Sequence, residues 1–312
     1  MTEANPLLPA GSCATRGCPG HFRHPDFGPK TLPLIRKGFY RRSSDRRKVQ
    51  RFQCRFCGRG SSDATHTLCY RQKKRHLNPV IDRLLNAGIS ERETSRMLGI
   101  RWETVSRKIV FLGVCSLIWH RRELGRRLRE KGPIREIQFD EMETFEHSKW
   151  KPLSLPLAVD PKTRAILDIR VASMPARGLM AARAREKYGN RADDRPKVAG
   201  RLWKNLRPFL AQNPDILSDM NPKYPGWIEP HFPEAIHRTV KGRRGCVVGQ
   251  GELKRGGFDP LFALNHTAAM LRANINRLFR RTWCTTKLAW KLEMRLWMYV
   301  RKHNVAVGWQ PA

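Results

Sequence analysis

The sequence is poor in acidic residues. Of its 312 residues, 27 are Asp or Glu and 61 are Lys or Arg, which gives a formal net charge of +34. Residues 1–133 carry 10 acidic and 29 basic groups and the rest carries 17 and 32, so the deficit extends along the whole chain. This distribution excludes a neutral protein with a basic tail. It predicts a polyanionic partner, because each phosphate neutralised by Lys or Arg releases bound counterions.

Long apolar runs are also missing. No stretch of 18 apolar residues occurs, which excludes a membrane-spanning helix. The opening residues, MTEANPLLPAGS, lack the basic and apolar regions of a signal peptide, so a cytoplasmic protein with no membrane partner is expected. In that compartment the eight cysteines are expected to be thiols or zinc ligands rather than disulfides. The length suffices for one sizeable core and one or two small modules.

Four of the cysteines form two pairs near the N-terminus. Cys54-Arg-Phe-Cys57, followed by a glycine, has the form of a tight zinc knuckle, because glycine allows the left-handed turn that the knuckle needs. Cys13 and Cys18 make a second, slightly wider pair. Together they predict a structural Zn²⁺ site in a module of residues 13–70. Two alternatives are open: Cys13 and Cys18 are ordinary thiols, or one of them is replaced as ligand by a histidine, namely His21, His24 or His66.

The segment between the two pairs is strongly basic. Residues 36–75 contain 14 basic and 2 acidic groups. Residues 39–42 and 49–53 are predicted to form the two strands of a ribbon hairpin. Basic side chains on such a hairpin can contact DNA phosphates, and those expected to do so are Arg41, Arg42, Arg46 and Arg47.

Residues 77–133 are predicted to form a second module, which begins with three short helices over 78–112. Ser90 followed by Glu93 is a capping box at the start of a helix. That helix ends at Gly99, and the spacing of Gly99 and Val105 fits the turn and the buried anchor of a helix-turn-helix. The next helix is then expected to direct toward DNA the side chains of Arg101, Trp102, Thr104, Arg107 and Lys108. A plain three-helix packing module is the alternative.

Two aspartates follow apolar runs in the remaining segment, residues 134–303. Asp140 stands at the end of an alternating strand pattern, and Asp219 follows Ile216-Leu-Ser. Residues 152–171 predict a hairpin that turns at Asp160-Pro161. A strand, a hairpin and a later strand ending in an aspartate are the parts of an RNase H-like core. Two such carboxylates on neighbouring strands can share Mg²⁺ or Mn²⁺.

A third oxygen ligand is expected from a helix that starts near Asp259. Asn265 is its candidate, although an amide oxygen is a poorer ligand than a carboxylate. Glu252 is the alternative third ligand, in a glycine-rich segment. Glu141, next to Asp140, is expected to alternate to the other face of its strand.

At this point the chain resembles insertion-sequence transposases of the DDE, RNase H-like superfamily that carry an N-terminal zinc ribbon and a helix-turn-helix. The resemblance covers about residues 13–303. It depends on the order of five pieces: Arg51-Phe-Gln-Cys54-Arg-Phe-Cys57-Gly58, the segment 90–109, Phe139-Asp140-Glu141-Met142, Ile216-Leu-Ser-Asp219, and a C-terminal helix with Asn265, Arg272 and Arg277-Leu-Phe-Arg280-Arg281-Thr282.

The resemblance implies an α/β multidomain protein whose zinc ribbon (13–70) and helix-turn-helix module (77–133) precede an RNase H-like mixed-sheet catalytic core (134–303) with C-terminal helices. Asp140 and Asp219 would be the first two catalytic acids, and Asn265 stands where the family has a glutamate. The site is then an Asp-Asp-Asn variant, or Glu252 has taken the third place, or the copy is inactive. Arg277, Arg280 and Arg281 would contact DNA near the active site.

By the same resemblance, the protein is expected to be a nucleoid-associated prokaryotic transposase. It would bind double-stranded DNA at the terminal inverted repeats of an element, then cut and join strands with Mg²⁺, working as a homo-oligomer because two ends must be paired. The first alternative is a non-catalytic DNA-binding protein, such as a regulator or a decayed transposase. An RNA-binding zinc-ribbon protein would explain the charge but leaves the two aspartates without a role.

Overall fold

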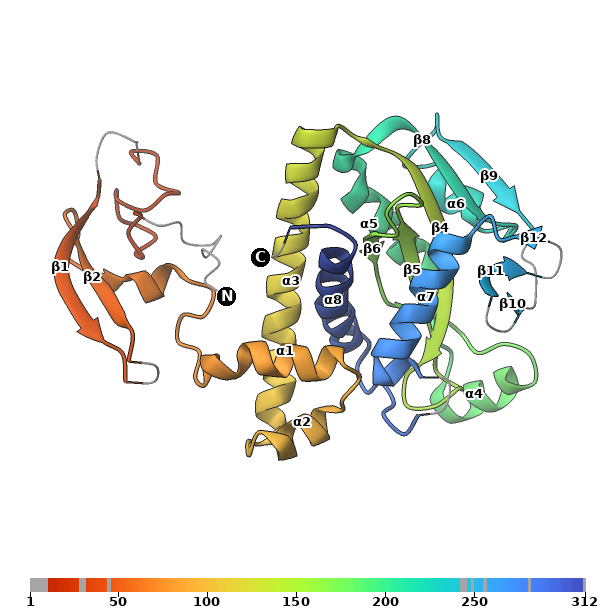
Figure 1. Ribbon diagram of the computed structural model, residues 1–312, viewed down its shortest axis with the longest axis horizontal. Coiled ribbons are helices and arrows are strands. Elements are labelled where there is room, and N and C mark those ends of the chain that lie inside the picture. The colour runs from red at the N-terminus through yellow and green to blue at the C-terminus, as the bar shows by residue number, and fades with distance from the viewer. Residues whose placement is uncertain are drawn as a thin grey trace. The chain divides into compact units, whose positions relative to one another are not determined.

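The computed structural model describes residues 11–27, 32–43, 46–241, 246–247, 250–254, 257–279 and 282–310 (Figure 1). The chain divides into two compact units, Met1–Val80 and Ile81–Pro311. No helix in the described ranges has the length and apolar content that crossing a bilayer requires.

The first unit is built on a three-stranded antiparallel sheet in the order β1-β2-β3. The strands are β1 (Leu34–Arg41), β2 (Lys48–Cys54) and β3 (Gly60–Ser62), followed by the short turns η1 (Asp63–His66) and η2 (Arg75–Leu77). Both strands of the expected hairpin are present, and β1 begins earlier than predicted. A bulge between Arg36 and Phe39 includes Gly38, whose φ of 71° lies in the left-handed region that glycine adopts readily.

Three helices follow: α1 (Asn78–Asn86), whose first three residues fall in the first unit, α2 (Glu91–Met97) and α3 (Trp102–Lys131). The Ser90 hydroxyl caps α2 by accepting a hydrogen bond from the Glu93 backbone N–H at 3.1 Å. Gly99 occupies the turn with a φ of 58°, and Val105 is fully buried. The α2–turn–α3 pattern therefore follows the predicted boundaries at its start.

The length of α3 corrects the sequence prediction. We expected a short third helix that ends near residue 112, but α3 runs for 30 residues to a glycine C-cap at Gly132. The helix contains no proline, and its interior glycines do not end it. One of them, Gly113, lies where α3 meets the C-terminal helix α8 (Ala289–Ala306). A Cβ at Gly113 would lie 2.6 Å from the Met294 carbonyl oxygen, so this glycine permits close packing rather than a break.

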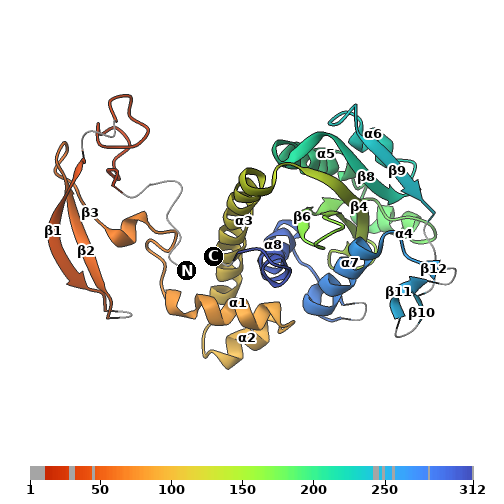
Figure 2. The same ribbon diagram turned by 45° about the horizontal axis from the view of Figure 1, so that its top comes forward.

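A mixed sheet forms the centre of the second unit, with strand order β6-β5-β4-β8-β9 (Figures 1 and 2). β4 pairs antiparallel with β5 and parallel with β8, which in turn pairs parallel with β9. The bounds are β4 (Ile134–Phe145), β5 (Pro152–Val159), β6 (Ile166–Ile169), β8 (Leu210–Asp219) and β9 (Ile236–Val240). β7 (Ala172–Ser173) pairs with β5, and a small separate sheet holds β10 (Cys246–Val247), β11 (Gln250–Lys254) and β12 (Gly257–Phe258).

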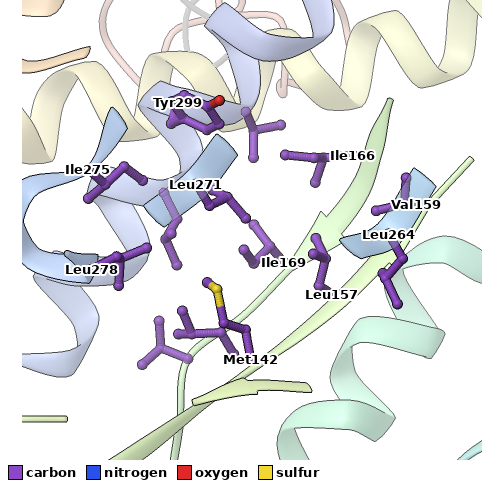
Figure 3. Packing of buried hydrophobic residues seen from close by; sticks show 14 of the residues in the cluster. Met142, Leu157, Val159, Ile166, Ile169, Leu264, Leu271, Ile275, Leu278 and Tyr299 are labelled. Atoms are coloured by element: carbon purple, nitrogen blue, oxygen red, sulfur yellow. The ribbon is translucent and has the colours of Figure 1, made fainter. Parts of the chain in front are cut away.

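Helices cover both faces of this sheet. One face packs on α7 (Phe262–Asn274) and α8, where Met142, Leu157, Leu264 and Leu271 belong to one apolar cluster (Figure 3). The other face packs on α5 (Arg195–Leu206) and α6 (Tyr224–Ile228), and Phe139 lies there against Trp203 with ring centroids 4.9 Å apart. The fold is thus α/β with a mixed sheet, and β4 alternates its side chains between two buried layers.

Candidate functional site

The four N-terminal cysteines converge in the first unit. The Sγ atoms of Cys13 and Cys57 lie 3.5 Å apart, those of Cys18 and Cys54 lie 3.6 Å apart, and all four are within 4.8 Å of one another. Zinc–sulfur bonds of about 2.3 Å place tetrahedral sulfurs roughly 3.8 Å apart, so the cluster fits Zn²⁺. Across the described ranges this is the one place where three or more His, Cys, Asp or Glu side chains converge in this way.

Backbone donors complete the knuckles. The N–H groups of Thr15 and Gly20 each donate to a cysteine sulfur at 3.4 Å. The backbone N–H of Arg59 lowers the pKa of Cys57 to about 7, whereas burial raises the pKa of Cys18 to about 12 in the absence of metal. The set consists of cysteines alone, so the alternatives in which a histidine serves as ligand are not needed.

Basic side chains surround a hollow of about 460 Å³ in the same unit. Arg42, Arg47, Lys48 and Arg75 contribute to its wall. Arg41, Arg46 and Arg47 are exposed, and Arg42 is half-buried. The sheet of this unit therefore presents the concentration of positive charge that its sequence predicted.

The expected DNA-facing residues of α3 are only partly exposed. Arg101 and Arg107 are exposed, Trp102 is 52% exposed and Thr104 is half-buried. Lys108 was wrongly expected to face outward, because it is only 4% exposed. With Val105, Ile109 and Leu112 it falls at helical positions i, i+3, i+4 and i+7, which form the inward face of α3.

The two aspartates occupy neighbouring positions on adjacent parallel strands. Phe139 of β4 is in register with Ser218 of β8, so Asp140 and Asp219 are the next residues on each strand. Adjacent strands lie about 4.8 Å apart, and residues in register point to the same face. Gln138 and Met142 show that this is the α7 side. Both aspartates are half-buried.

Tyr224 was not foreseen from the sequence, yet its hydroxyl contacts Asp140. It donates to Asp140 Oδ1 at 2.7 Å and accepts the Glu141 backbone N–H at 3.1 Å. The Glu141 N–H also donates to Asp140 Oδ1 at 2.6 Å, so the carboxylate accepts from both the tyrosine hydroxyl and the neighbouring backbone. Burial, and then the negative charge of Asp140, raises the pKa of Tyr224. The hydroxyl therefore stays protonated and acts as the hydrogen-bond donor to Asp140.

The loop that carries Tyr224 starts from the other aspartate. Asp219 Oδ1 accepts the Asn221 N–H at 3.0 Å, and the Asn221 carbonyl accepts the Tyr224 N–H at 3.2 Å. One short connection thus fixes Asp219 at one end and the Asp140 carboxylate at the other.

Glu141 lies on the opposite face, as its position in the strand predicted. Its carboxylate accepts a hydrogen bond from Ser154 and lies 3.8 Å from the Arg195 guanidinium. Burial raises its pKa. It is therefore part of the packing against α5 rather than a neighbour of the Asp140 carboxylate.

The start of α7 is clamped to β4 by Gln138. The Gln138 amide accepts the Leu264 N–H at 3.0 Å and donates to the Pro260 carbonyl at 2.8 Å. Gln138 is two residues before Asp140 and shares its face of the strand. This contact holds the first turn of α7, and with it Asn265, on the side of the sheet to which the aspartates point.

Asp259 orients Asn265. The Asn265 side-chain amide donates to Asp259 Oδ2 at 2.7 Å, and Asp259 Oδ1 accepts the Leu261 N–H at 3.1 Å. The N–H₂ group of Asn265 is thus committed to Asp259, and its carbonyl oxygen lies on the other side of the amide. The helix was expected to start near Asp259, but α7 begins at Phe262 with Leu261 as its N-cap.

Of the three C-terminal arginines predicted to contact DNA, Arg277 is the one that lies within the described residues. Arg277 forms an ion pair with Glu91 in the first turn of α2, and both side chains are largely buried. This intramolecular partner replaces the expected exposure toward DNA. Glu252 lies in β11, but its side chain is outside the described residues, as are Arg280 and Arg281.

No protein-family model matches the sequence, and a search of curated proteins finds no match. Function is therefore inferred from the geometry above.

The hydroxyl of Tyr224 gives a direct prediction. If Asp140 holds a catalytic metal ion, Tyr224→Phe is expected to lower the metal-dependent activity about tenfold to a hundredfold, because Asp140 loses a donor that fixes its carboxylate. The reduced rate should be partly restored at high Mn²⁺ concentration, a rescue that a merely structural defect would not show. Equal rates for the variant and the wild type at low metal concentration would remove this positioning role.

Proposed function

We propose that this protein is a DDE-type polynucleotidyl transferase, a transposase that cuts and rejoins DNA with divalent metal. The observation that carries the proposal is the register of β4 and β8, which makes Asp140 and Asp219 neighbours at the open end of a parallel strand pair. The antiparallel hairpin of β5 and β6, which lies between β4 and β8 in the chain, and the helices on both faces support an RNase H-like core.

The chemistry requires oxygen ligands arranged for two cations. Mg²⁺ or Mn²⁺ bound there would activate the attacking oxygen and stabilise the leaving oxygen of a phosphodiester. Asp140 and Asp219 would hold the ions, and the carbonyl oxygen of Asn265 is proposed as the third ligand. A water oxygen first forms a bond to phosphorus and a 3′-oxygen leaves as a hydroxyl. That hydroxyl then attacks a target phosphodiester, and no covalent protein–DNA intermediate is needed.

Three parts of the chain are proposed to share the work. Residues 13–70, with zinc at the four cysteines, and residues 77–133 would bind the element's terminal repeats. Residues 134–303 would carry the catalytic core. The charge of +34 supports a phosphate-rich partner for all three parts.

The test is strand transfer. Purified protein should join a pre-cut terminal repeat, taken from the DNA that flanks the gene, to a target plasmid with Mg²⁺ or Mn²⁺ but not with Ca²⁺ or EDTA. DNA binding without any joining would support the second candidate, a non-catalytic DNA-binding protein. The asparagine in place of a third carboxylate favours that candidate.

Asn265 separates the alternatives for the third ligand. If its amide oxygen binds metal, Asn265→Ala should lower strand transfer by about a hundredfold or more, because the oxygen ligand is lost. Glu252→Gln is the matched variant for the competing ligand. A loss in Glu252→Gln together with full activity in Asn265→Ala would transfer the role to Glu252.

A further inference from the structure

A second hollow lies in the second unit, away from the aspartates. It has a volume of about 330 Å³ and lies between the turn after β4 and the helix α4 (Met180–Tyr188). Its wall includes two aromatic rings, Trp150 and Tyr188, and three cations, Lys151, Arg185 and Arg191. The helices of the catalytic core do not account for this arrangement, since Trp150 and Tyr188 belong to neither apolar cluster of the sheet.

The two rings form an angled aromatic wall. Their centroids are 6.5 Å apart and their planes meet at 67°. Tyr188 is 43% exposed and Trp150 is partly exposed, so each ring keeps a face that a ligand can reach. An ammonium group also lies near each ring: Lys187 Nζ is 5.2 Å from the Trp150 centroid and Lys151 Nζ is 5.4 Å from that of Tyr188.

Arg191 adds a fixed donor at the same wall. Its terminal nitrogens donate to Glu146 at 3.3 Å and to Ser173 at 3.1 Å, which holds the guanidinium in place. Its Nε–H is buried and has no hydrogen-bond partner among the described residues. The guanidinium stays in one orientation beside the hollow, held by Glu146 and Ser173.

These features select the chemistry of the ligand. An aromatic wall alone would also suit a cationic ligand, but no carboxylate lines this hollow, and although Glu146 beside it pairs with Lys151 and Arg191, Arg185 adds a further cation to the wall. A ligand that is flat and apolar in one part and anionic in another fits both properties. A nucleotide has this composition, because its base can stack on a ring while its phosphate meets Lys or Arg.

We propose that this hollow binds an unpaired nucleotide, with the base stacked on Trp150 or Tyr188. β4 links the aspartates to the hollow. Phe145, where the strand ends next to the turn that carries Trp150, is five positions after Asp140, a span of about 17 Å. The site deepens the proposed function, since it rests on DNA as partner. It assigns the hollow to a single-stranded segment of that DNA beside the cut.

The experiment measures binding without catalysis. A short duplex with a single-stranded overhang containing 2-aminopurine is titrated with full-length protein in EDTA, and fluorescence reports both affinity and stacking. The same duplex with an abasic overhang, and one with no overhang, are the comparison DNAs. Free deoxyadenosine monophosphate is added as a competitor, to distinguish a strand from a free nucleotide as the source of the base.

The wild type should bind the 2-aminopurine overhang about tenfold more tightly than the abasic overhang, with quenched fluorescence. Trp150→Ala and Tyr188→Ala should each reduce this preference, whereas Trp150→Phe retains a ring and should keep most of it. Trp290→Ala is the matched control, because Trp290 is a 52% exposed tryptophan that is not part of the wall. Thermal unfolding of each variant shows that it is folded.

The outcomes separate this inference from the proposed function. Normal duplex binding with no preference for the base-bearing overhang, or a preference that persists in both alanine variants, overturns the nucleotide site alone. Failure to bind any of the DNAs overturns both. Competition by the free nucleotide at equal affinity supports the site but identifies a mononucleotide as its ligand.

Discussion

Replacing Asp140 or Asp219 with asparagine is expected to lower strand cleavage and strand transfer by about 1000-fold or more. In the proposed mechanism each substitution removes a charged oxygen ligand from a site that would hold divalent cations, and such ligands contribute several kcal/mol to the stabilisation of the transition state. The measurement is single-turnover cleavage and joining of a labelled terminal repeat in Mg²⁺ and in Mn²⁺. DNA affinity should be unchanged or slightly higher, because a negative charge near the phosphates has been removed.

Asp215→Asn is the matched control for this experiment. Asp215 is also on β8, but it is four residues before Asp219 and forms an ion pair with Arg238. Its loss should change activity little, since surface ion pairs contribute about 1 kcal/mol or less to stability. If Asp140→Asn and Asp219→Asn remain as active as Asp215→Asn, the assignment of these carboxylates to catalysis is wrong.

The second large effect is expected from the cysteine cluster. Cys54→Ser should abolish zinc binding and unfold the first unit, because this unit has almost no apolar core. Its described buried apolar side chains before Ile81 are Cys13, Cys18, Pro33, Val49, Cys54 and Cys69. Without a larger core, the metal must supply the folding free energy, which is about 10 kcal/mol or more for structural zinc. Zinc content measured by mass spectrometry should fall from about one equivalent per chain to none.

The second unit should survive this substitution, because its sheet has apolar clusters on both faces. Hydrogen exchange should therefore rise over residues 13–62 and stay low over β4 and β5. DNA binding should weaken and become less sensitive to salt as the basic sheet loses its form. Cys284→Ser, outside the cluster, is the control. Full zinc occupancy in Cys54→Ser would contradict the four-cysteine site.

Local chemistry explains which predictions from sequence were right. The two cysteine pairs, the serine cap at Ser90 and the glycine at Gly99 depend on neighbouring residues, and each was read correctly. Strand alternation likewise located β4, and the turn at Asp160-Pro161 located the hairpin of β5 and β6. Such patterns depend on residues that are close in the sequence, so they can be recognised from a single sequence.

Features that depend on distant packing were missed. Lys108 was assigned to an exposed face because the sequence does not show that α3 continues into a 30-residue helix. Tyr224 follows Asp219 by five residues, and nothing in that spacing indicates a contact with Asp140 across the sheet. Gln138 offered a signal, as a polar residue on the buried face of a strand, two residues from an aspartate.

The continuity of α3 has a consequence for how DNA would be presented to the sheet. Thirty residues of helix extend about 45 Å, and Gly113 brings this rod against Met294 without a gap. The helix start, where Arg101 and Arg107 are exposed, is thereby rigidly joined to the strand that bears Asp140. If the proposed function is right, the number of base pairs between the bases contacted by the start of α3 and the phosphate cut beside Asp140 would be fixed. A shift of the cut by one base pair would then require a change in the length or path of α3.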